Sequence, residues 1–374
     1  MKITRMSIRR LSVDATPFYA PFPVPDDEPA IWEYPLLVLS TDDGLDGYSM
    51  SYGTNGEGRG CAYLLNDIYR CDILGTDPFH SEAMWHQLRR KNRHLYALSD
   101  CLSGVIDVAL WDLKGKAAGK SIAKMIGIAR EKVPSYASAT WSLETPQQVA
   151  DEAVAKRDAG YHGYKMQWRE GPCKDIPKLR AARAAVGDAF PLMHDPNAQY
   201  SYEQALEVGR VLDELGFLWF EEPIPDRQTE MIRKLADELA TPILATETLM
   251  LDETVQVIRS SAADLVRGDV HLKSGITGLR KMIGMCELFG INMEIHTAAS
   301  PILDVANLQV ACTTHLSRFI ESHHALFRFG LKNNPLEIDA QGYVHLPAGP
   351  GLGIDLDWDW IEDHTIEIIE ADGG

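Results

Sequence analysis

The stretches PLMHDPN (residues 191–197), FLWFEEP (217–223) and PILATETL (242–249) each close an apolar run with an acidic residue. The acids are Asp195, Glu221 and Glu247, and each step between them is 26 residues. A strand–helix unit that repeats at this interval brings the ends of neighbouring parallel strands side by side. We therefore expect the three carboxylates to converge at the C-terminal mouth of a barrel.

Three converging carboxylates repel one another unless a cation lies between them. A ligand set made only of oxygen atoms, with room for water, suits Mg²⁺ better than Zn²⁺. The sequence therefore predicts a Mg²⁺ site formed by Asp195, Glu221 and Glu247.

The middle of the chain alternates between short apolar runs and amphipathic helical stretches. One of these helices is predicted to begin at Ser201, which forms a capping box with Gln204. Alternation of this kind requires parallel strands with right-handed crossovers, and about eight such units fit a barrel better than an open sheet. The candidate strands are Val133–Ala139, His162–Trp168, Phe190–Asp195, Phe217–Glu221, Pro242–Glu247, Leu265–Asp269, Asn292–His296 and Phe319–Glu321.

The chain is too long for one ordinary core, so we expect it to divide into parts. Residues 1–128 are predicted to form an α+β cap. Residues 129–345 carry the strand–helix repeats and are predicted to form the barrel. Residues 346–374 resume strand character and are expected to return to the cap.

The predicted cap combines strands, one long helix and loops that reach the barrel mouth. Strand-like alternation covers Ile3–Leu11 and Tyr34–Thr41, and helical spacing covers Leu98–Lys116. Pro17–Pro29 contains too many prolines for a helix or a central strand, and we expect it to be a lid loop. This lid and Tyr48–Gly53 are expected to determine which substrate is accepted.

Composition excludes several classes of partner. The chain has 54 acidic and 36 basic residues, a formal net charge of −18, which argues against nucleic acid and anionic membranes as partners. The N-terminal MKITRMSIRRLSVD lacks the apolar core of a signal peptide, and no apolar run is long enough to span a membrane. The six cysteines are scattered without a CxxC pair, as is typical of reduced thiols. We therefore expect a cytoplasmic protein.

Further polar residues lie on strands beside the acidic triad. Asp269 ends LVRGD and His296 ends NMEIH, so adjacent strands would pair them as a dyad in which the carboxylate raises the basicity of the imidazole. In HGYKMQW, alternation sends Lys165 and Gln167 to the same face. A lysine inside a barrel requires negative charge nearby, which the carboxylates or a bound substrate would supply. Glu321, which ends FIE, is a candidate for hydrogen bonding a ligand.

This arrangement resembles the enolase superfamily, specifically its mandelate racemase subgroup, over nearly the whole chain. VIDVALWDLKGKAAGKSIAKMIG (105–127) is similar to the cap helix of the family and its link into the barrel. The resemblance implies a modified (β/α)7β TIM barrel under an N-terminal α+β capping domain. It also implies a role for each matching position: Asp195, Glu221 and Glu247 as metal ligands, His296 and Asp269 as the acid/base dyad, and Glu321 as a helper acid.

One departure from the family concerns the second barrel strand. The family usually has Lys-x-Lys there, with the second lysine as a base, whereas this chain reads Lys165-Met166-Gln167. Gln167 cannot take up a proton at neutral pH. By the resemblance, Lys165 faces the carboxylate of the substrate. Candidate contacts to the rest of the substrate are Gln167, Trp168, Arg169 and Asn197.

The resemblance implies Mg²⁺-dependent removal of the proton α to a carboxylate. Because one face of that carbon lacks its usual base, we expect dehydration of a sugar acid, an aldonate or aldarate, to a 2-keto-3-deoxy acid. A racemase, epimerase or lactone cycloisomerase remains an alternative, as does a barrel that binds metal without catalysis. The family resemblance further implies a homo-oligomer, between a dimer and an octamer.

Overall fold

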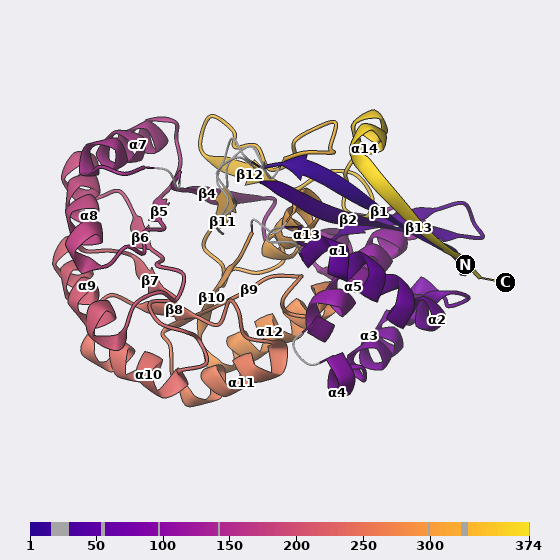
Figure 1. Ribbon diagram of the computed structural model, residues 1–374, viewed down its shortest axis with the longest axis horizontal. Helices are drawn as coiled ribbons and strands as arrows, with labels where there is room; N and C mark the ends of the chain where they lie inside the picture. Colours follow the sequence, from indigo (N-terminus) through magenta and orange to yellow (C-terminus); the bar gives the residue numbers. More distant parts are fainter. Residues whose placement is uncertain are drawn as a thin grey trace.

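Eight short parallel strands line the interior of the larger part of the molecule (Figure 1). They lie in the order β10-β9-β8-β7-β6-β5-β4-β11, and the short strand β12 (Tyr343–His345) pairs with β4 from outside this series. Each of the eight overlaps a strand that the alternation of apolar runs and helical stretches predicts. Their bounds are β4 (Lys132–Ser138), β5 (Tyr164–Met166), β6 (Leu192–His194), β7 (Trp219–Glu221), β8 (Ile243–Ala245), β9 (Leu265–Gly268), β10 (Asn292–Ile295) and β11 (Ile320–Ser322).

The barrel is nearly closed. The computed structural model describes residues 1–15, 30–53, 57–95, 98–140, 143–297, 300–322 and 328–373. Within these ranges no strand ladder joins β10 to β11. A side chain bridges that gap instead, because Thr297 Oγ1 donates a hydrogen bond to Glu321 O at 2.8 Å. The predicted (β/α) barrel is confirmed.

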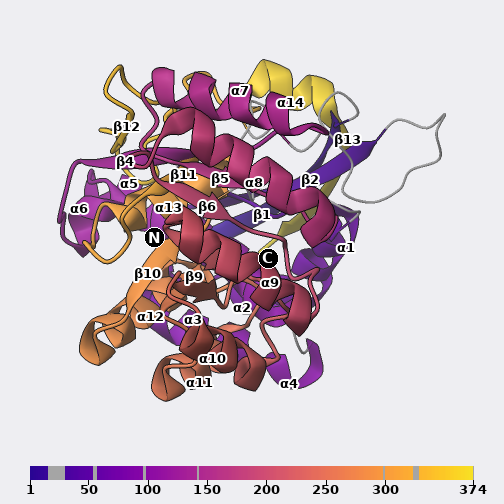
Figure 2. The ribbon, with the colours of Figure 1, turned by 90° about the vertical axis from the view of Figure 1, so that its left-hand side faces the viewer.

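Helices cover the outside of the barrel strands (Figures 1 and 2). The predicted capping box is present: Ser201 accepts from Gln204 N, and the Gln204 side chain accepts from Ser201 N. The helix that it starts ends before Gly216, whose φ of 61° suits a residue without a side chain. The seven helices are α7 (Pro146–Asp158), α8 (Pro172–Val186), α9 (Tyr202–Leu215), α10 (Thr229–Glu238), α11 (Leu251–Ser260), α12 (Gly275–Phe289) and α13 (Pro301–Ala311).

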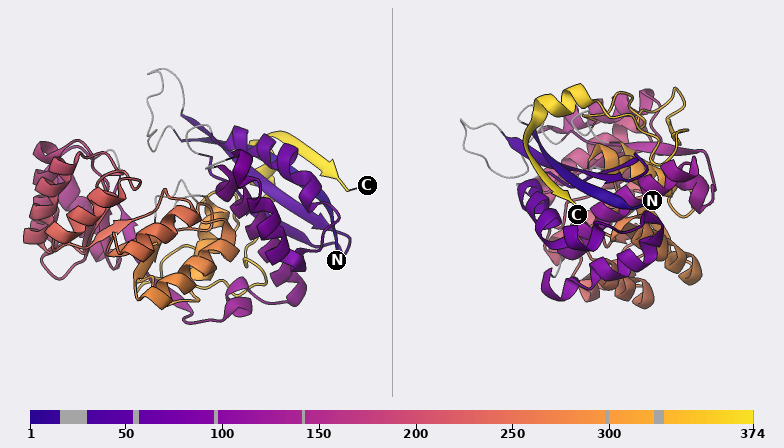
Figure 3. Two further views of the ribbon diagram at one scale, coloured as in Figure 1. Left: turned by 90° about the horizontal axis from the view of Figure 1, so that it is seen from below. Right: turned by 90° about the vertical axis from the view of Figure 1, so that its right-hand side faces the viewer.

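A second, antiparallel sheet forms the cap in the order β13-β1-β2-β3. Its strands are β1 (Ile3–Asp14), β2 (Ile31–Thr41), β3 (Asp46–Met50) and β13 (Thr365–Asp372). Because β13 pairs with β1, the two ends of the chain lie together on this sheet (Figure 3). The cap helices are α1 (Glu57–Leu64), α2 (Arg70–Ile73), α3 (Ser81–Arg89), α4 (Asn92–Leu95), α5 (Leu98–Ala118) and α6 (Ile122–Ile126), with a π-helical turn at Leu65–Tyr69 and a 3-10 turn at Pro78–His80.

The predicted cap strands and the long cap helix are present, and the tail differs from its prediction in one detail. The tail was expected to resume strand character, which β13 does, but Trp358–His364 forms a helix, α14, ahead of that strand. The reason is local, since Asp357 accepts a hydrogen bond from Trp360 N and so caps the first turn. Strand β3 overlaps the start of Tyr48–Gly53, the segment expected to help determine which substrate is accepted, and Ser51–Gly53 continues beyond the strand. The predicted lid, Pro17–Pro29, lies outside the described residues.

Helix α5 joins the cap to the barrel. Asp107 on α5 accepts hydrogen bonds from Thr277 N at 2.9 Å and Thr277 Oγ1 at 2.7 Å, and so caps α12 of the barrel. Gly275 at this junction has a φ of 86°, and a Cβ on it would lie 2.3 Å from Asp107 Oδ2. This close approach requires glycine. In the described part of the chain, no helix is both long enough and apolar enough to cross a membrane.

Candidate active site

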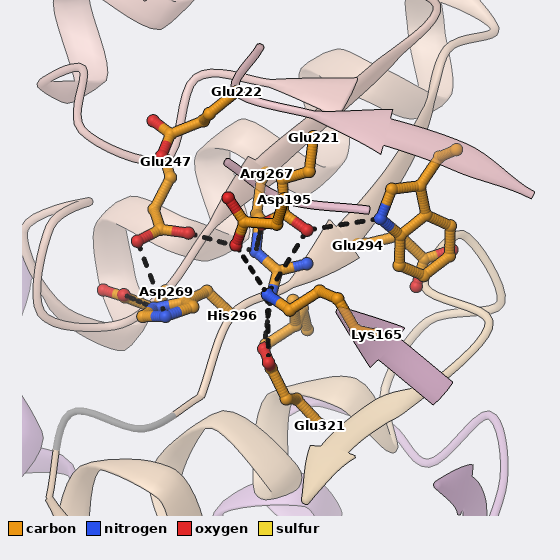
Figure 4. A network of polar contacts seen from close by, with 12 residues as sticks. Lys165, Asp195, Glu221, Glu222, Glu247, Arg267, Asp269, Glu294, His296 and Glu321 are labelled. Carbon is orange, nitrogen blue, oxygen red and sulfur yellow. Dashed lines mark hydrogen bonds and ion pairs between the residues drawn. The ribbon is translucent and has the colours of Figure 1, made fainter. Parts of the chain in front are cut away.

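The ends of β6, β7 and β8 bring three carboxylates together. Asp195 directly follows β6, Glu221 is the last residue of β7, and Glu247 lies two residues beyond β8. Asp195 and Glu221 are buried, whereas the Glu247 side chain is 18% exposed. Figure 4 shows their carboxylates turned toward one centre. The equal spacing along the sequence thus corresponds to neighbouring positions in space.

Lys165 on β5 lies among these carboxylates. Its Nζ is 3.1 Å from Asp195 Oδ2, 3.3 Å from Glu221 Oε2 and 3.0 Å from Glu321 Oε1. Burial lowers the pKa of this lysine, but the carboxylates, Glu221 first among them, outweigh burial and raise the pKa well above its ordinary value. The lysine is therefore held in its charged form by the carboxylates around it.

A second cation, Arg267 on β9, also points into the cluster (Figure 4). Its side chain is fully buried, and Nε lies 2.8 Å from Glu221 Oε1 and 3.3 Å from Glu247 Oε2. On the other side of the guanidinium, Nη2 donates to Tyr136 Oη at 2.9 Å and to Glu321. We call Asp195, Glu221, Glu247 and Glu321 the carboxylate ring.

Sequence reasoning missed Arg267, although a signal for it was present. Strand residues two apart face the same side, so Asp269 at the barrel mouth places Arg267 on the same face one layer deeper. A charged residue in that position of a buried strand indicates a paired internal charge.

The predicted dyad forms at the neighbouring strand ends. His296 follows β10, Asp269 follows β9, and His296 Nδ1 lies 2.7 Å from Asp269 Oδ2. Burial lowers the pKa of His296, but Glu247 and the hydrogen bond to Asp269 together raise it to about 9. Burial raises the pKa of Asp269, yet His296 holds it at about 2. The charged carboxylate only accepts, so Nδ1 carries a proton and Nε2 is the nitrogen that can exchange one.

His296 Nε2 faces the carboxylate ring, at 3.5 Å from Glu247 Oε1. In the sheet order four strands separate β5 from β10, so Gln167, just after β5, approaches the ring from another side of the barrel, where its Nε2 donates to Asp195 Oδ2 at 3.3 Å. An imidazole and an amide therefore lie on different sides of one cluster, and only the imidazole can transfer a proton at neutral pH.

The remaining candidate substrate contacts lie close to the ring. Arg169 Nη1 donates to Asn197 Oδ1 at 3.0 Å, and Asn197 N donates to Asp195 Oδ1 at 2.9 Å. Glu321 is buried on β11, where Lys165 and Arg267 contact it and Ser138 donates to it. Trp168, by contrast, is buried in the hydrophobic core.

Three residues beside the ring have left-handed backbones, which side chains disfavour. The φ angles are 48° for Asn197, 35° for Glu222 and 86° for Thr246. They follow β6, β7 and β8 within two residues of an acid of the ring. Backbone strain of this kind persists where the surrounding structure enforces it and often marks functional sites.

The cap also reaches this end of the barrel. Ser51, just after β3, lies 3.3 Å from His271 Nε2, and the ring of Tyr52 packs edge-on against His271 with centroids 4.6 Å apart. His271 is two residues beyond Asp269 of the dyad. The segment Tyr48–Gly53, expected to contact substrate, thus ends beside the dyad.

The chemistry of the ring suits a hard divalent cation. Its four carboxylates face two fixed cations, Lys165 and Arg267, which leaves an excess of negative charge. Glu221 Oε1 is buried and has no hydrogen-bond donor among the described residues. Burial and the neighbouring acids raise the pKa of Glu221, although the charges of Arg267 and Lys165 oppose this. An additional positive charge would relieve these costs.

The carboxylates of the ring are nevertheless not positioned to coordinate a metal ion in this structure. Across the described ranges, no group of three or more His, Cys, Asp or Glu side chains is placed to hold a metal ion. The reason is visible in Figure 4, where Lys165 and Arg267 lie between the carboxylates. The carboxylate oxygens are ligands of the type that Mg²⁺ prefers. They would have to move closer together to coordinate one ion.

Comparisons with known proteins agree with this geometry. A family profile described as "Enolase C-terminal domain-like" matches residues 148–360, and one described as "Mandelate racemase / muconate lactonizing enzyme, N-terminal domain" matches residues 28–127. The chain is 30% identical to the arabinonate dehydratase of Saccharolobus solfataricus over 86% of this chain and 88% of that one. It is 29% identical to the D-galactarolactone cycloisomerase of Agrobacterium fabrum over 87% of this chain and 89% of that one.

A solved structure shows the same fold over nearly the full length. It is the D-glucarate dehydratase from Agrobacterium tumefaciens complexed with magnesium, with a TM-score of 0.86 and 28% identity. The match covers 98% of this chain and 100% of the other. The chain therefore belongs to the mandelate racemase/muconate lactonizing enzyme family of the enolase superfamily.

Proposed function

We propose that this protein dehydrates a sugar acid to a 2-keto-3-deoxy acid. The observation that carries the proposal is the asymmetry of the site. The His296–Asp269 dyad lies on one side of the carboxylate ring, and Gln167 lies on another. A racemase needs a proton-transfer group on each face of the α-carbon, whereas dehydration can be completed from one face.

His296 performs both proton transfers in this scheme. In its neutral form, it accepts the α-proton at Nε2, because Nδ1 donates to Asp269. The electron pair of the broken C–H bond moves into the substrate carboxyl group as an enediolate. Asp269 and Glu247 stabilise the imidazolium that results, since both raise the pKa of His296.

The imidazolium then returns the same proton to the β-hydroxyl group, which leaves as water. The enediolate electron pair forms the new carbon–carbon double bond as the C–O bond breaks. The enol so formed loses its O–H proton and gains one at the β-carbon, which gives the ketone. The net change is the loss of one water molecule, with no oxidant or reductant.

The negative charge of the enediolate must be stabilised by positive charge. Residues of the ring and Lys165 beside it are placed to provide or hold that charge. Asp195, Glu221 and Glu247 would hold Mg²⁺, which supplies positive charge where the substrate carboxylate becomes more negative. Lys165 contacts two of these ligands, Asp195 and Glu221, and would face the same carboxylate. The magnesium in the related D-glucarate dehydratase supports this assignment.

The printed names of the relatives support a sugar acid as substrate. They include an arabinonate dehydratase and, for the second possible reaction, a D-galactarolactone cycloisomerase. A lactone cycloisomerase is the main alternative, because ring opening by β-elimination also needs only one proton-transfer face. It would yield an open-chain acid from a lactone, without net loss of water.

The test is a product screen. The protein would be incubated with Mg²⁺ and a panel of aldonic acids, aldaric acids and their lactones, and keto acids would be detected by proton NMR. We expect one or a few acids to give a 2-keto-3-deoxy product with wild type and none with His296→Asn. Conversion of a lactone alone would favour the cycloisomerase, and no reaction across the panel would contradict both.

A matched control is available on the surface. His345 Nε2 lies 2.7 Å from Asp339 Oδ2, the same distance as in the dyad, but His345 is exposed on the short strand β12 and Asp339 is partly exposed in the turn before it. His345→Asn is expected to retain the activity of wild type. Loss of activity in both variants would mean that the assay responds to general damage and not to the dyad.

A further inference from the structure

Arg267 is the feature of the site that the proposed reaction does not use. It lies on β9, in the barrel interior, with its side chain fully buried. A buried guanidinium is costly unless carboxylates and hydrogen bonds compensate it. Three carboxylates of the ring, Glu221, Glu247 and Glu321, are within contact distance and provide that compensation.

The two sides of the guanidinium are held differently. Nη2 is anchored by hydrogen bonds to Tyr136 Oη and Glu321. Nε lies 2.8 Å from Glu221 Oε1, yet neither atom has a hydrogen bond of adequate geometry to any described residue. The contact is therefore a close approach of opposite charges without the directed hydrogen bond that would satisfy either atom.

The atoms that face Arg267 are those that a metal would need. Glu221 Oε2 already accepts from Trp219 Nε1 at 3.2 Å and from Lys165, so Oε1 is the oxygen left for a cation. Glu247 Oε2 also faces Arg267 Nε, at 3.3 Å. Arg267 and a divalent ion would thus compete for Glu221 Oε1 and Glu247 Oε2.

We propose that Arg267 is a resident counter-ion that holds the carboxylate ring together without metal and weakens the affinity of the ring for a divalent cation. The inference rests on the proposed function only in placing a cation site at this ring. Arg267 is a positioning residue here, acting through Glu221 and Glu247. A divalent ion would then bind when the Arg267 side chain moves away from Glu221 Oε1 and Glu247 Oε2.

The test is a substitution that removes the charge of Arg267 and keeps most of the volume of its side chain. Arg267→Met removes the guanidinium and leaves a flexible apolar side chain in its place. We expect Mn²⁺, used as the probe and measured by electron paramagnetic resonance of the free ion, to bind at least about tenfold more tightly than to wild type. The metal-free variant should melt at a lower temperature than metal-free wild type, and Mn²⁺ should raise its melting temperature by more.

Arg183→Met is the matched control. Arg183 is also buried, but among the described residues its guanidinium donates only to backbone carbonyls, those of Gly187, Phe190, Leu215 and Gly216. Its loss should lower the melting temperature without changing the Mn²⁺ affinity. Tighter binding in both variants would show that general loosening of the fold is responsible, and would overturn the proposal.

Other outcomes separate this inference from the proposed function. Equal or weaker Mn²⁺ binding by Arg267→Met would overturn the role of Arg267 and leave the metal site intact. Absence of Mn²⁺ binding in wild type and variant would contradict both. A third measurement needs no variant: wild type stripped with EDTA should still unfold in one cooperative transition, and loss of that transition would show that metal, and not Arg267, holds the ring.

Discussion

The hydrogen bond from His296 to Asp269 determines what the histidine can do. Asp269 is buried, and it also accepts from Leu272 N at 2.6 Å, so its carboxylate is fixed in position. Its charge fixes the proton of His296 on Nδ1 and leaves Nε2 toward the ring. The function of one residue therefore depends on the charge and the position of another.

Asp269→Asn tests this dependence. The amide keeps the size of the carboxylate but removes its charge and its preference for the Nδ1–H tautomer. We expect kcat on the dehydrated acid to fall by about 10²- to 10⁴-fold. Steady-state kinetics of keto-acid formation would measure the loss, with Asp339→Asn in the surface pair as the control. A fall of less than tenfold would contradict the assigned role of the dyad.

At the scale of elements, the site is a junction between barrel strands and the end of cap strand β3. Ser51 and Tyr52 contact His271, which follows β9 and lies near Asp269 and His296. Burial lowers the pKa of His271 to about 4, and the charge of nearby Asp269 only partly opposes this. The junction therefore packs around a neutral imidazole at neutral pH.

This neutral histidine gives a pH dependence with a defined sign. The unfolded chain takes up a proton on His271 near pH 6.5, whereas the folded protein resists it until about pH 4, so stability falls as the pH is lowered through this window. Between pH 7 and pH 5, wild type should lose about 2 kcal/mol more unfolding free energy than His271→Phe, which keeps the ring packing. Urea unfolding at both pH values measures this, and equal losses would contradict it.

At the scale of the whole molecule, the carboxylate ring links stability to metal. A ligand that binds only the folded protein stabilises it by about 2.7 kcal/mol at a concentration one hundred times its Kd. We therefore expect Mg²⁺ to raise the melting temperature of wild type, as measured by differential scanning calorimetry. Glu247→Gln should lose most of this rise. An unchanged rise in that variant would place the stabilising ion elsewhere.

The barrel is predictable from the sequence because the pattern of each strand and its end lies within a short segment of the chain. The strands β6, β7 and β8 lie in short apolar runs, and each acid of the triad ends such a run, so spacing alone places Asp195 beside Glu221. Contacts that depend on three-dimensional packing were not predictable in this way. The approach of Arg267 to Glu221 and Glu247, and of Ser51 to His271, joins residues from distant segments. Helix α14 was missed because one cap at Asp357 outweighs a strand-like pattern.

The most direct test of the account is proton NMR of a partial turnover in D₂O, with Mg²⁺ and an acid found in the product screen. A single proton-transfer face predicts that the 2-keto-3-deoxy acid accumulates while unreacted substrate keeps its configuration at the α-carbon, even where deuterium has entered. Accumulation of the α-epimer without keto acid would contradict the account, because inversion requires a second proton-transfer group on the side where this chain has Gln167.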